Sequence, residues 1–230
     1  RYPSFSGEPA LRDLSIDIKP GETLAILGAT GAGKSTLVHL LMRFYNPDAG
    51  EITLNGVPLE KYKLDNLRGR IGMVLQKNEL FSGTIEENIR WGRPEASDEE
   101  VARAAQIAQA EEFILGFNDA YKTVVGEKGT SLSGGQKQRM CIARAILRDP
   151  EVLIFDDSTS ALDLGTEARL QKALREHLRE TTVIIIAQRI ASVMNADRIL
   201  VLENGSEAAL GTHEELLKNS GVYRDIYNSQ

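Results

Sequence analysis

The sequence predicts an α/β fold organised around a mainly parallel sheet. Short apolar runs alternate with segments of helical periodicity along most of the chain. The first apolar run, Thr23–Ala29, leads into a glycine-rich loop and then a helix from about Lys34 to Tyr45. Repetition of this strand-then-helix order is what a parallel sheet requires, because each strand must return to the same edge.

The remaining elements follow in chain order. A hairpin is expected at residues 51–59, because Asn55 and Gly56 both favour the positive φ of a tight turn. Thr212–Leu216 matches a capping box, with Thr212 as the N-cap, so that His213 is expected to begin a helix rather than bind a ligand. Four further strands are predicted at residues 70–76, 151–156, 182–187 and 198–203, the last closed by an Asn204-Gly205 turn, while residues 98–147 read almost entirely as helix and loop.

Composition limits the class of protein. The chain has 230 residues, 42% of them hydrophobic, which suffices for one sizeable core or for one core with an inserted subdomain. We expect residues 1–76 and 148–230 to form that core and residues 77–147 to form a helical subdomain. The net charge is −6, with 33 acidic against 27 basic residues, so a nucleic-acid partner is not expected. Cys141 is the single cysteine, which excludes a disulfide framework and predicts a packed, unreactive thiol.

A membrane span is not expected within the sequence. The longest apolar run, Val183–Ala187, is far shorter than the ~18 residues that a span needs. No signal-peptide pattern is present, and the chain begins at Arg1 without a methionine, so we expect it to be part of a longer protein. If it acts at a membrane, its partners supply the spans.

A phosphate-binding loop is predicted at Gly28–Thr36, "GATGAGKST", which lies between a buried strand and a helix. Glycines allow several backbone N–H groups to face one point, and the helix N-terminus adds partial positive charge. Lys34 is expected to reach the β- and γ-phosphates and Ser35 to ligate Mg²⁺. The alternative is a glycine-rich turn without a ligand. The residues expected to bind nucleotide here are Thr30, Gly31, Ala32, Gly33, Lys34, Ser35 and Thr36.

Two aspartates close a later apolar strand, "VLIFDD". Asp156 ends the strand, and ligands of open α/β sheets bind at the carboxyl ends of strands. We therefore expect Asp156 to hold Mg²⁺ beside Ser35. A helix-capping role is the alternative for a lone aspartate at this place.

Three segments carry a family resemblance over essentially the whole chain. "LSGGQKQR", residues 132–139, lies between the phosphate loop and the acidic strand end, and in this order it resembles the signature of ATP-binding cassette (ABC) ATPases. Residues 74–89 resemble the glutamine loop of the exporter branch, with Gln76 at the strand end. Residues 124–136 resemble the exporter segment that touches the membrane domain, with Glu127 as its acidic residue. Tyr2 is similar to the aromatic residue on which adenine stacks.

The resemblance implies a P-loop NTPase (RecA-like) core with an antiparallel β subdomain and an inserted helical subdomain. It implies Mg²⁺ and ATP as ligands, with Gln76 also near the metal. It further implies a head-to-tail dimer, in which a second ABC nucleotide-binding domain supplies the signature that completes each site. Ser133, Gly134, Gly135 and Gln136 would then face the partner's ATP. The transmembrane domains of the same transporter are the other implied partners, at the cytoplasmic face of the cell membrane.

Two departures from the family pattern concern hydrolysis. The residue after the strand-end aspartate is usually glutamate, the group that polarises the attacking water, but here it is Asp157. Its carboxylate is one methylene shorter, and a ~1 Å misplacement of a catalytic group can cost ~10²-fold. The family places a switch histidine after the "VIIIA" strand, where this chain has Gln188, which cannot carry charge or accept a proton.

These departures, beside intact binding motifs, predict a site that holds ATP and hydrolyses it slowly. The pattern resembles the degenerate half of heterodimeric multidrug-type exporters, whose signature completes a faster site on another chain. Two alternatives stay open: a homodimeric exporter ATPase in which Asp157 is a working base, and a regulatory subunit that binds ATP without turnover. A soluble ABC protein is disfavoured, because its exporter-like loops would lack a membrane partner.

Overall fold

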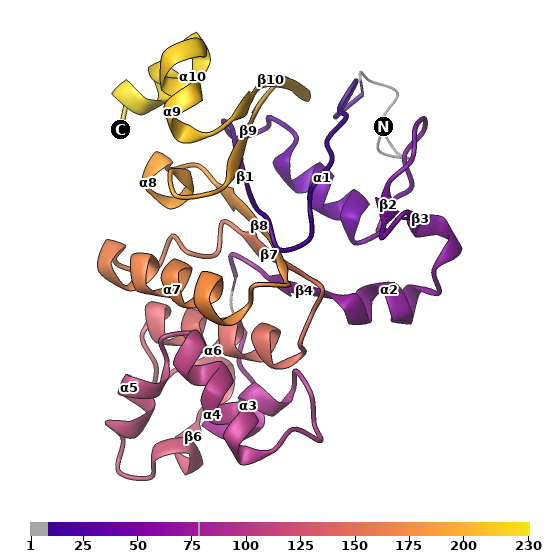
Figure 1. Cartoon of the computed structure of the whole chain (residues 1–230). Coiled ribbons are helices and arrows are strands. Elements are labelled where there is room, and N and C mark those ends of the chain that lie inside the picture. The colour runs from indigo at the N-terminus through magenta and orange to yellow at the C-terminus, as the bar shows by residue number, and fades with distance from the viewer. Residues whose placement is uncertain (1–8, 78) are drawn as a thin grey trace. The chain divides into compact units, whose positions relative to one another are not determined.

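The computed structural model describes residues 9–77 and 79–230, which fall into two compact units (Figure 1). The first unit combines Arg1–Ile71 with Thr182–Gln230, and the second is Gly72–Thr181. Tyr2, predicted to stack on adenine, lies outside the described residues. Within the part of the chain that is described, no helix has the length and apolar character needed to cross a bilayer.

The first unit contains a four-strand group in the order β10-β9-β1-β8. Strand β1 is parallel to both β8 and β9, and β10 is antiparallel to β9, which confirms the predicted mainly parallel sheet. Helices α1 and α8 lie on opposite sides of these strands (Figure 1). The elements are β1 (Thr23–Leu27), α1 (Lys34–Leu41), β2 (Thr53–Leu54), β3 (Val57–Pro58), η1 (Leu59–Lys61), α2 (Leu64–Arg70), β8 (Thr182–Ala187), α8 (Ile190–Val193), β9 (Arg198–Glu203), β10 (Ser206–Gly211), α9 (His213–Asn219) and α10 (Gly221–Asn228).

The strands of this unit form its core. All five residues of β1 are buried, as are the last five of β8 and Ile199–Leu202 of β9. Continuous apolar strands of this kind need cover on both faces. Each fully buried Leu or Ile contributes about 1.5–3 kcal/mol from burial, so these strands hold the adjoining loops in fixed positions.

Local turn and capping signals were predicted correctly. Asn55 and Gly56 have φ values of 52° and 74°, and the β2–β3 hairpin forms around them. Asn204 and Gly205 turn in the same way between β9 and β10. Thr212 caps α9 in a complete capping box with Glu215, and the side chain of His213, the first residue of that helix, contacts Tyr223.

Helix α1 is shorter than expected, because it ends at Leu41 rather than near Tyr45. Arg43 adopts a left-handed conformation with φ 51°, and the Phe44 N–H bonds back to the carbonyl of His39 at 2.8 Å. This closure satisfies carbonyls at the helix end, as a left-handed C-terminal cap does. The residue is an arginine instead of the usual glycine, so the sequence carried no stop signal here.

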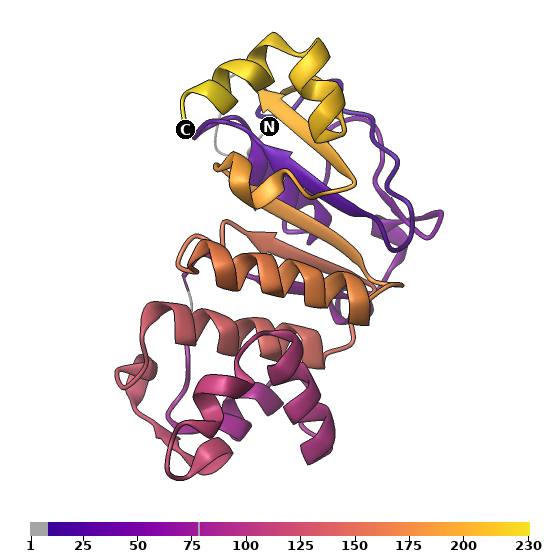
Figure 2. The ribbon, with the colours of Figure 1, turned by 60° about the vertical axis from the view of Figure 1, so that its left-hand side comes forward.

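The second unit contains two neighbouring strands, β7 and β4, and, among the described residues, five of the ten α-helices. Its two long helices, α6 and α7, lie side by side in both views (Figures 1 and 2). The segment expected to form a helical subdomain, residues 77–147, lies within this unit together with β4, β7 and α7. The elements are β4 (Ile71–Val74), β5 (Gly83–Thr84), α3 (Ile85–Arg90), α4 (Asp98–Ile107), α5 (Glu111–Leu115), η2 (Ala120–Lys122), β6 (Val124–Val125), η3 (Glu127–Gly129), α6 (Gly134–Leu147), β7 (Val152–Asp156) and α7 (Leu164–His177).

Two details of this unit differ from the sequence expectation. Strands β5 and β6 pair within the segment expected to be helix and loop, and two residues each are too few to show a period of two. Strand β4 ends at Val74, so Gln76 lies two residues beyond the strand end and not at it. Leu75 is 52% exposed there, which shows that the chain has already left the packed sheet.

Candidate nucleotide site

The predicted phosphate loop links β1 to α1 in the first unit. Gly31 and Gly33 have φ values of 86° and 105°, a region that residues with side chains rarely occupy. A Cβ at Gly33 would lie 2.6 Å from the Leu11 side chain and 3.0 Å from the Ala10 carbonyl oxygen, so only glycine fits. Gly33 also accepts the first helical hydrogen bond, from the Leu37 N–H at 3.0 Å. The backbone curl that a phosphate needs is therefore present at the N-terminus of α1.

Lys34 lies inside this loop. The residue is 9% exposed, and its Nζ donates to the carbonyl oxygens of Gly28 at 2.6 Å and Ala29 at 2.9 Å. A buried ammonium needs hydrogen-bond partners, and these two loop carbonyls are among them. Positive charge is thus held beside the helix N-terminus, which suits an anionic ligand.

Gln188 lies at the same edge of the first unit as the phosphate loop. Leu27 pairs with Ala187 in the parallel register of β1 and β8. Gly28 directly follows β1, and Gln188 directly follows β8. The phosphate loop and Gln188 therefore begin at the ends of two neighbouring strands. Gln188 is exposed. The topology therefore brings Gln188, which was assigned through the family resemblance, to the same edge as the phosphate loop.

The two aspartates lie at the end of β7 in the second unit. Asp156 is the last strand residue, and Asp157 follows it with a left-handed φ of 47°. The turn is held by the Ser160 hydroxyl, which donates to the Asp157 carbonyl at 3.0 Å. Asp157 Oδ2 accepts a hydrogen bond of 3.3 Å from Gln76 Nε2. Two residues predicted to act in hydrolysis therefore contact each other directly.

The signature segment begins α6. Ser133 is the N-cap: its hydroxyl accepts from the Gln136 N–H at 3.3 Å, and the Gln136 side chain accepts from the Ser133 N–H at 2.9 Å. Gly134 and Gly135 form the first turn, where helix N–H groups have no helical partner. A Cβ at Gly134 would meet no atom within 4 Å, so no steric conflict requires glycine there. That opening allows close approach of another molecule to the backbone.

The predicted metal ligands are divided between the units. Ser35 belongs to the first unit, whereas Gln76 and Asp156 belong to the second. Hydroxyl, amide and carboxylate oxygens are the donors that Mg²⁺ prefers. Across residues 9–77 and 79–230, no group of three or more His, Cys, Asp or Glu could hold a metal by itself.

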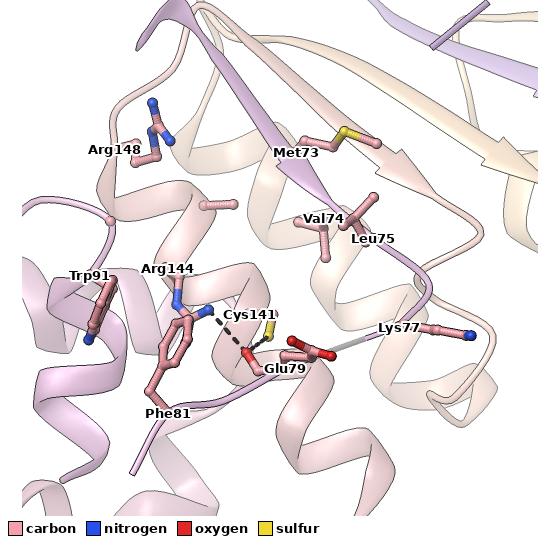
Figure 3. Close-up of a pocket in the computed structure, with 12 residues that line it drawn as sticks. Met73, Val74, Leu75, Lys77, Glu79, Phe81, Trp91, Cys141, Arg144 and Arg148 are labelled. Atoms are coloured by element: carbon pink, nitrogen blue, oxygen red, sulfur yellow. Dashed lines mark hydrogen bonds between the residues drawn. The ribbon is translucent and has the colours of Figure 1, made fainter. Parts of the chain in front are cut away.

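A groove in the second unit was not predicted from the sequence (Figure 3). It measures about 480 Å³, and Phe81 stacks on Trp91 in its wall with ring centroids 4.4 Å apart. Trp91 is 62% exposed, although large aromatic side chains are usually packed. No periodic signal marks these residues, because they belong to a loop and to the end of a short helix. The other lining residues are Met73, Val74, Leu75, Lys77, Glu79, Gly92, Cys141, Arg144, Ala145 and Arg148.

Arg144 supports the floor of this groove. Its guanidinium donates to the carbonyls of Asn88 at 2.9 Å and Glu79 at 3.2 Å, and lies 5.4 Å from the Phe81 ring centroid. Burial lowers the pKa of Arg144 from its ordinary value. Cys141, expected to be core, is only half-buried and lines the groove instead. Burial raises the pKa of its thiol, which agrees with the expectation of low reactivity.

Comparison with known proteins identifies the family. The family model described as "ABC transporter" matches residues 11–160. The chain belongs to the ABC transporter family. Among ABC relatives, the Bacillus subtilis (strain 168) protein named "Uncharacterized ABC transporter ATP-binding protein YfiB" is 51% identical over 230 residues, which are all of this chain and 40% of the relative.

Two further ABC proteins extend the comparison. A Staphylococcus aureus (strain NCTC 8325 / PS 47) protein, provisionally named as a multidrug export ATP-binding/permease protein, is 46% identical over 96% of this chain and 38% of its own length. A solved structure, titled "Structure of a bacterial Atm1-family ABC exporter with ATP bound", is 41% identical with a TM-score of 0.91, covering 96% of this chain and 39% of that one. The chain thus spans about 40% of the length of these ABC relatives. The match confirms the predicted P-loop ABC fold.

Proposed function

We propose that this chain is the ATP-binding domain of an ABC exporter, with a slow hydrolytic site of its own. The observation that carries the proposal is the buried Lys34 ammonium within the glycine loop at the N-terminus of α1. A polyphosphate is the ligand that suits an ammonium beside a helix N-terminus, because hydrogen bonds between a cation and phosphate oxygens are charge-assisted. The ABC solved structure contains ATP, and the sequence motifs around the loop select the same ligand.

Hydrolysis requires water to attack the γ-phosphorus while the bond to the β-phosphate oxygen breaks. Lys34 neutralises the phosphate charge, and the loop N–H groups hold the phosphates in line. Ser35, Gln76 and Asp156 are the residues that would hold Mg²⁺, and a bound Mg²⁺ would neutralise further phosphate charge. Asp157 accepts the proton of the attacking water in this scheme.

Two features support slow turnover at this site. The Asp157 carboxylate is short, and one of its oxygens already accepts the Gln76 amide at 3.3 Å. Gln188, at the neighbouring strand end to the phosphate loop, offers an amide where the family pattern has a histidine. General-base assistance is worth about 10²–10⁴-fold, so weak placement of the base has a large effect on rate.

A second nucleotide-binding domain is the proposed head-to-tail partner. The first turn of α6 supports this assignment, because a Cβ at Gly134 would meet no atom within 4 Å, so an anion can approach the backbone there. A different chain is favoured over a second copy, because two copies would place two slow sites together. The homodimer with Asp157 as a working base is the competing assignment.

The transmembrane part of the same transporter is the proposed occupant of the groove around Trp91. The chain spans about 40% of the length of its relatives, and one of these relatives is provisionally named as an ATP-binding/permease protein. A permease portion would account for the rest of the length of such a relative. An exposed aromatic pair in a groove that also carries charged side chains is the kind of site that receives a partner helix. The proposed location is the cytoplasmic face of a membrane.

Nucleotide binding tests the core of the proposal. Lys34→Ala should weaken Mg·ATP affinity by about 10- to 100-fold in calorimetry, since a charge-assisted hydrogen bond contributes ~1.5–3 kcal/mol. Lys172→Ala is the matched control, because that lysine side chain is 73% exposed on α7. If Lys34→Ala bound Mg·ATP with unchanged affinity, residues 28–36 would not be the phosphate-binding loop.

A further inference from the structure

Gln230 reaches from the end of α10 to the turn that carries Gln188. Its Nε2 donates to the Gln188 carbonyl oxygen at 2.8 Å, and its Oε1 accepts from the Ile190 N–H at 2.8 Å. One side-chain amide therefore bonds both ends of a three-residue turn. Gln230 and Gln188 are 42 residues apart in sequence and belong to the same unit.

The turn has a specific need for this amide. Helix α8 begins at Ile190, and its N-cap residue Arg189 makes no side-chain capping bond. The N–H groups of a helix's first turn lack helical partners, and Ile190 is buried, so an acceptor from elsewhere is required. Gln230 supplies that acceptor. In many helices a serine or aspartate at the N-cap position accepts such a hydrogen bond from its own helix.

The end of α10 is itself anchored. The Ser229 hydroxyl donates to the Ile226 carbonyl at 2.8 Å, and Tyr223 of the same helix is completely buried, with its hydroxyl 2.7 Å from His213 Nδ1. The amide of Gln230 is therefore presented from a fixed helix end. A helix end that is held in place limits where the Gln230 amide can reach, which favours its contacts with the turn.

We propose that Gln230 is a positioning residue that sets the direction of Gln188 toward the γ-phosphate. The proposal rests on the function assigned above. Gln188 follows β8 beside the start of the phosphate loop, and its backbone direction is set by the bond at its carbonyl. Loss of that bond lets the turn rotate, so Gln188 contacts the terminal phosphate less often. ADP lacks that phosphate, so its binding is independent of Gln230.

The test measures ATP and ADP affinities at this site in the full transporter, with the partner's nucleotide site disabled. Gln230→Ala should reduce the preference for ATP over ADP about 3- to 10-fold, with ADP affinity unchanged within twofold. Gln230→Glu keeps the acceptor for the Ile190 N–H but loses the donor to the Gln188 carbonyl. It should therefore also reduce the preference for ATP over ADP. Asn228→Ala, which removes an exposed amide from the same helix end, is the matched control.

A double-variant cycle separates positioning from a general structural effect. In a Gln188→Ala background, Gln230→Ala should cause no further loss of ATP preference. A loss that persists in that background, or an unchanged preference in Gln230→Ala alone, would overturn the inference. Failure of the parent protein to bind ATP would instead overturn the proposed function, and the Lys34→Ala measurement identifies that case.

Discussion

Gln76 and Asp157 are joined by a 3.3 Å hydrogen bond between side chains that lie 81 residues apart in the sequence. Gln76 lies two residues beyond the end of β4, and Asp157 occupies a left-handed turn after the neighbouring strand β7. The bond engages one of the two oxygens of the carboxylate proposed to act on water. The position of this carboxylate is therefore coupled to the segment that resembles the glutamine loop of ABC exporters.

Lengthening the base should increase hydrolysis. Asp157→Glu restores one methylene of reach, so turnover at this site should rise, by up to about 10²-fold if a ~1 Å misplacement is the main defect. Adding Gln188→His should raise it further, because histidine carries charge and exchanges protons. The two effects should be non-additive, since both residues act on the same phosphate.

This rate is best measured in the full transporter with the partner's site disabled. Asp157→Asn serves as the control, because it keeps the length of the side chain but cannot accept a proton as a base. If the double variant hydrolyses no faster than the parent, the defect lies in the partner's signature rather than in Asp157 and Gln188.

Blocking the signature should stop the partner's site and spare this chain's own site. Ser133→Arg places a long cation at the open first turn of α6, where Ser133 now caps the helix. Turnover of the full transporter should fall to near background while ATP remains bound at this chain's phosphate loop. Because the variant also removes a cap worth about 1 kcal/mol, Ser97→Arg, which removes the equivalent cap of α4, controls for stability. Full activity in Ser133→Arg would show that the signature serves no partner.

Removing the Trp91 side chain from the groove should weaken the coupling between this domain and the transmembrane part of the transporter. Trp91→Ala removes the exposed ring that stacks on Phe81, and buried aromatic anchors at interfaces are often worth ≥2 kcal/mol. Transport in vesicles should fall at least several-fold, whereas Mg·ATP affinity should be unchanged. Leu115→Ala is the control, because Leu115 is 60% exposed in the same unit outside the groove. Equal transport by the two variants would contradict docking at Trp91.

Stability should decline at alkaline pH through a buried tyrosine. Desolvation, with a smaller contribution from Tyr227, raises the pKa of Tyr223 from 10.0 to about 12. Between these values the unfolded chain loses the phenolic proton while the folded chain keeps it, so unfolding is favoured as pH rises. The free energy of unfolding should fall by roughly 1.4 kcal/mol per pH unit in this window and be unaffected by this group below pH 9.

Denaturant titrations between pH 9 and 12 measure this decline. Desolvation also raises the pKa of Tyr121 to about 12, so part of the decline belongs to the second unit. Tyr223→Phe should reduce the slope and cost about 0.5–1.5 kcal/mol at neutral pH through the lost contact with His213. A slope identical to that of the parent would mean that Tyr223 titrates in the folded state at its ordinary pKa.

Local chemistry accounts for what the sequence by itself determined. The phosphate loop, the Asn-Gly turns at residues 55–56 and 204–205, and the capping boxes at Ser133 and Thr212 depend on residues a few positions apart. Their residue types therefore predict their conformations directly. The order of strands and helices predicted the parallel sheet for the same reason, because the spacing of apolar residues within each segment distinguishes a strand from a helix.

Only the tertiary structure decided which distant residues meet. The hydrogen bond between Gln76 and Asp157 depends on the order of the strands. The hydrogen bonds that Gln230 makes with Gln188 and Ile190 depend on where helix α10 ends. The aromatic groove at Trp91 likewise depends on how a short helix packs on α6, and exposure of a tryptophan has no sequence pattern. Contacts of this kind arise from packing between elements, and packing depends on the shapes of both partners at once, so no single segment encodes it.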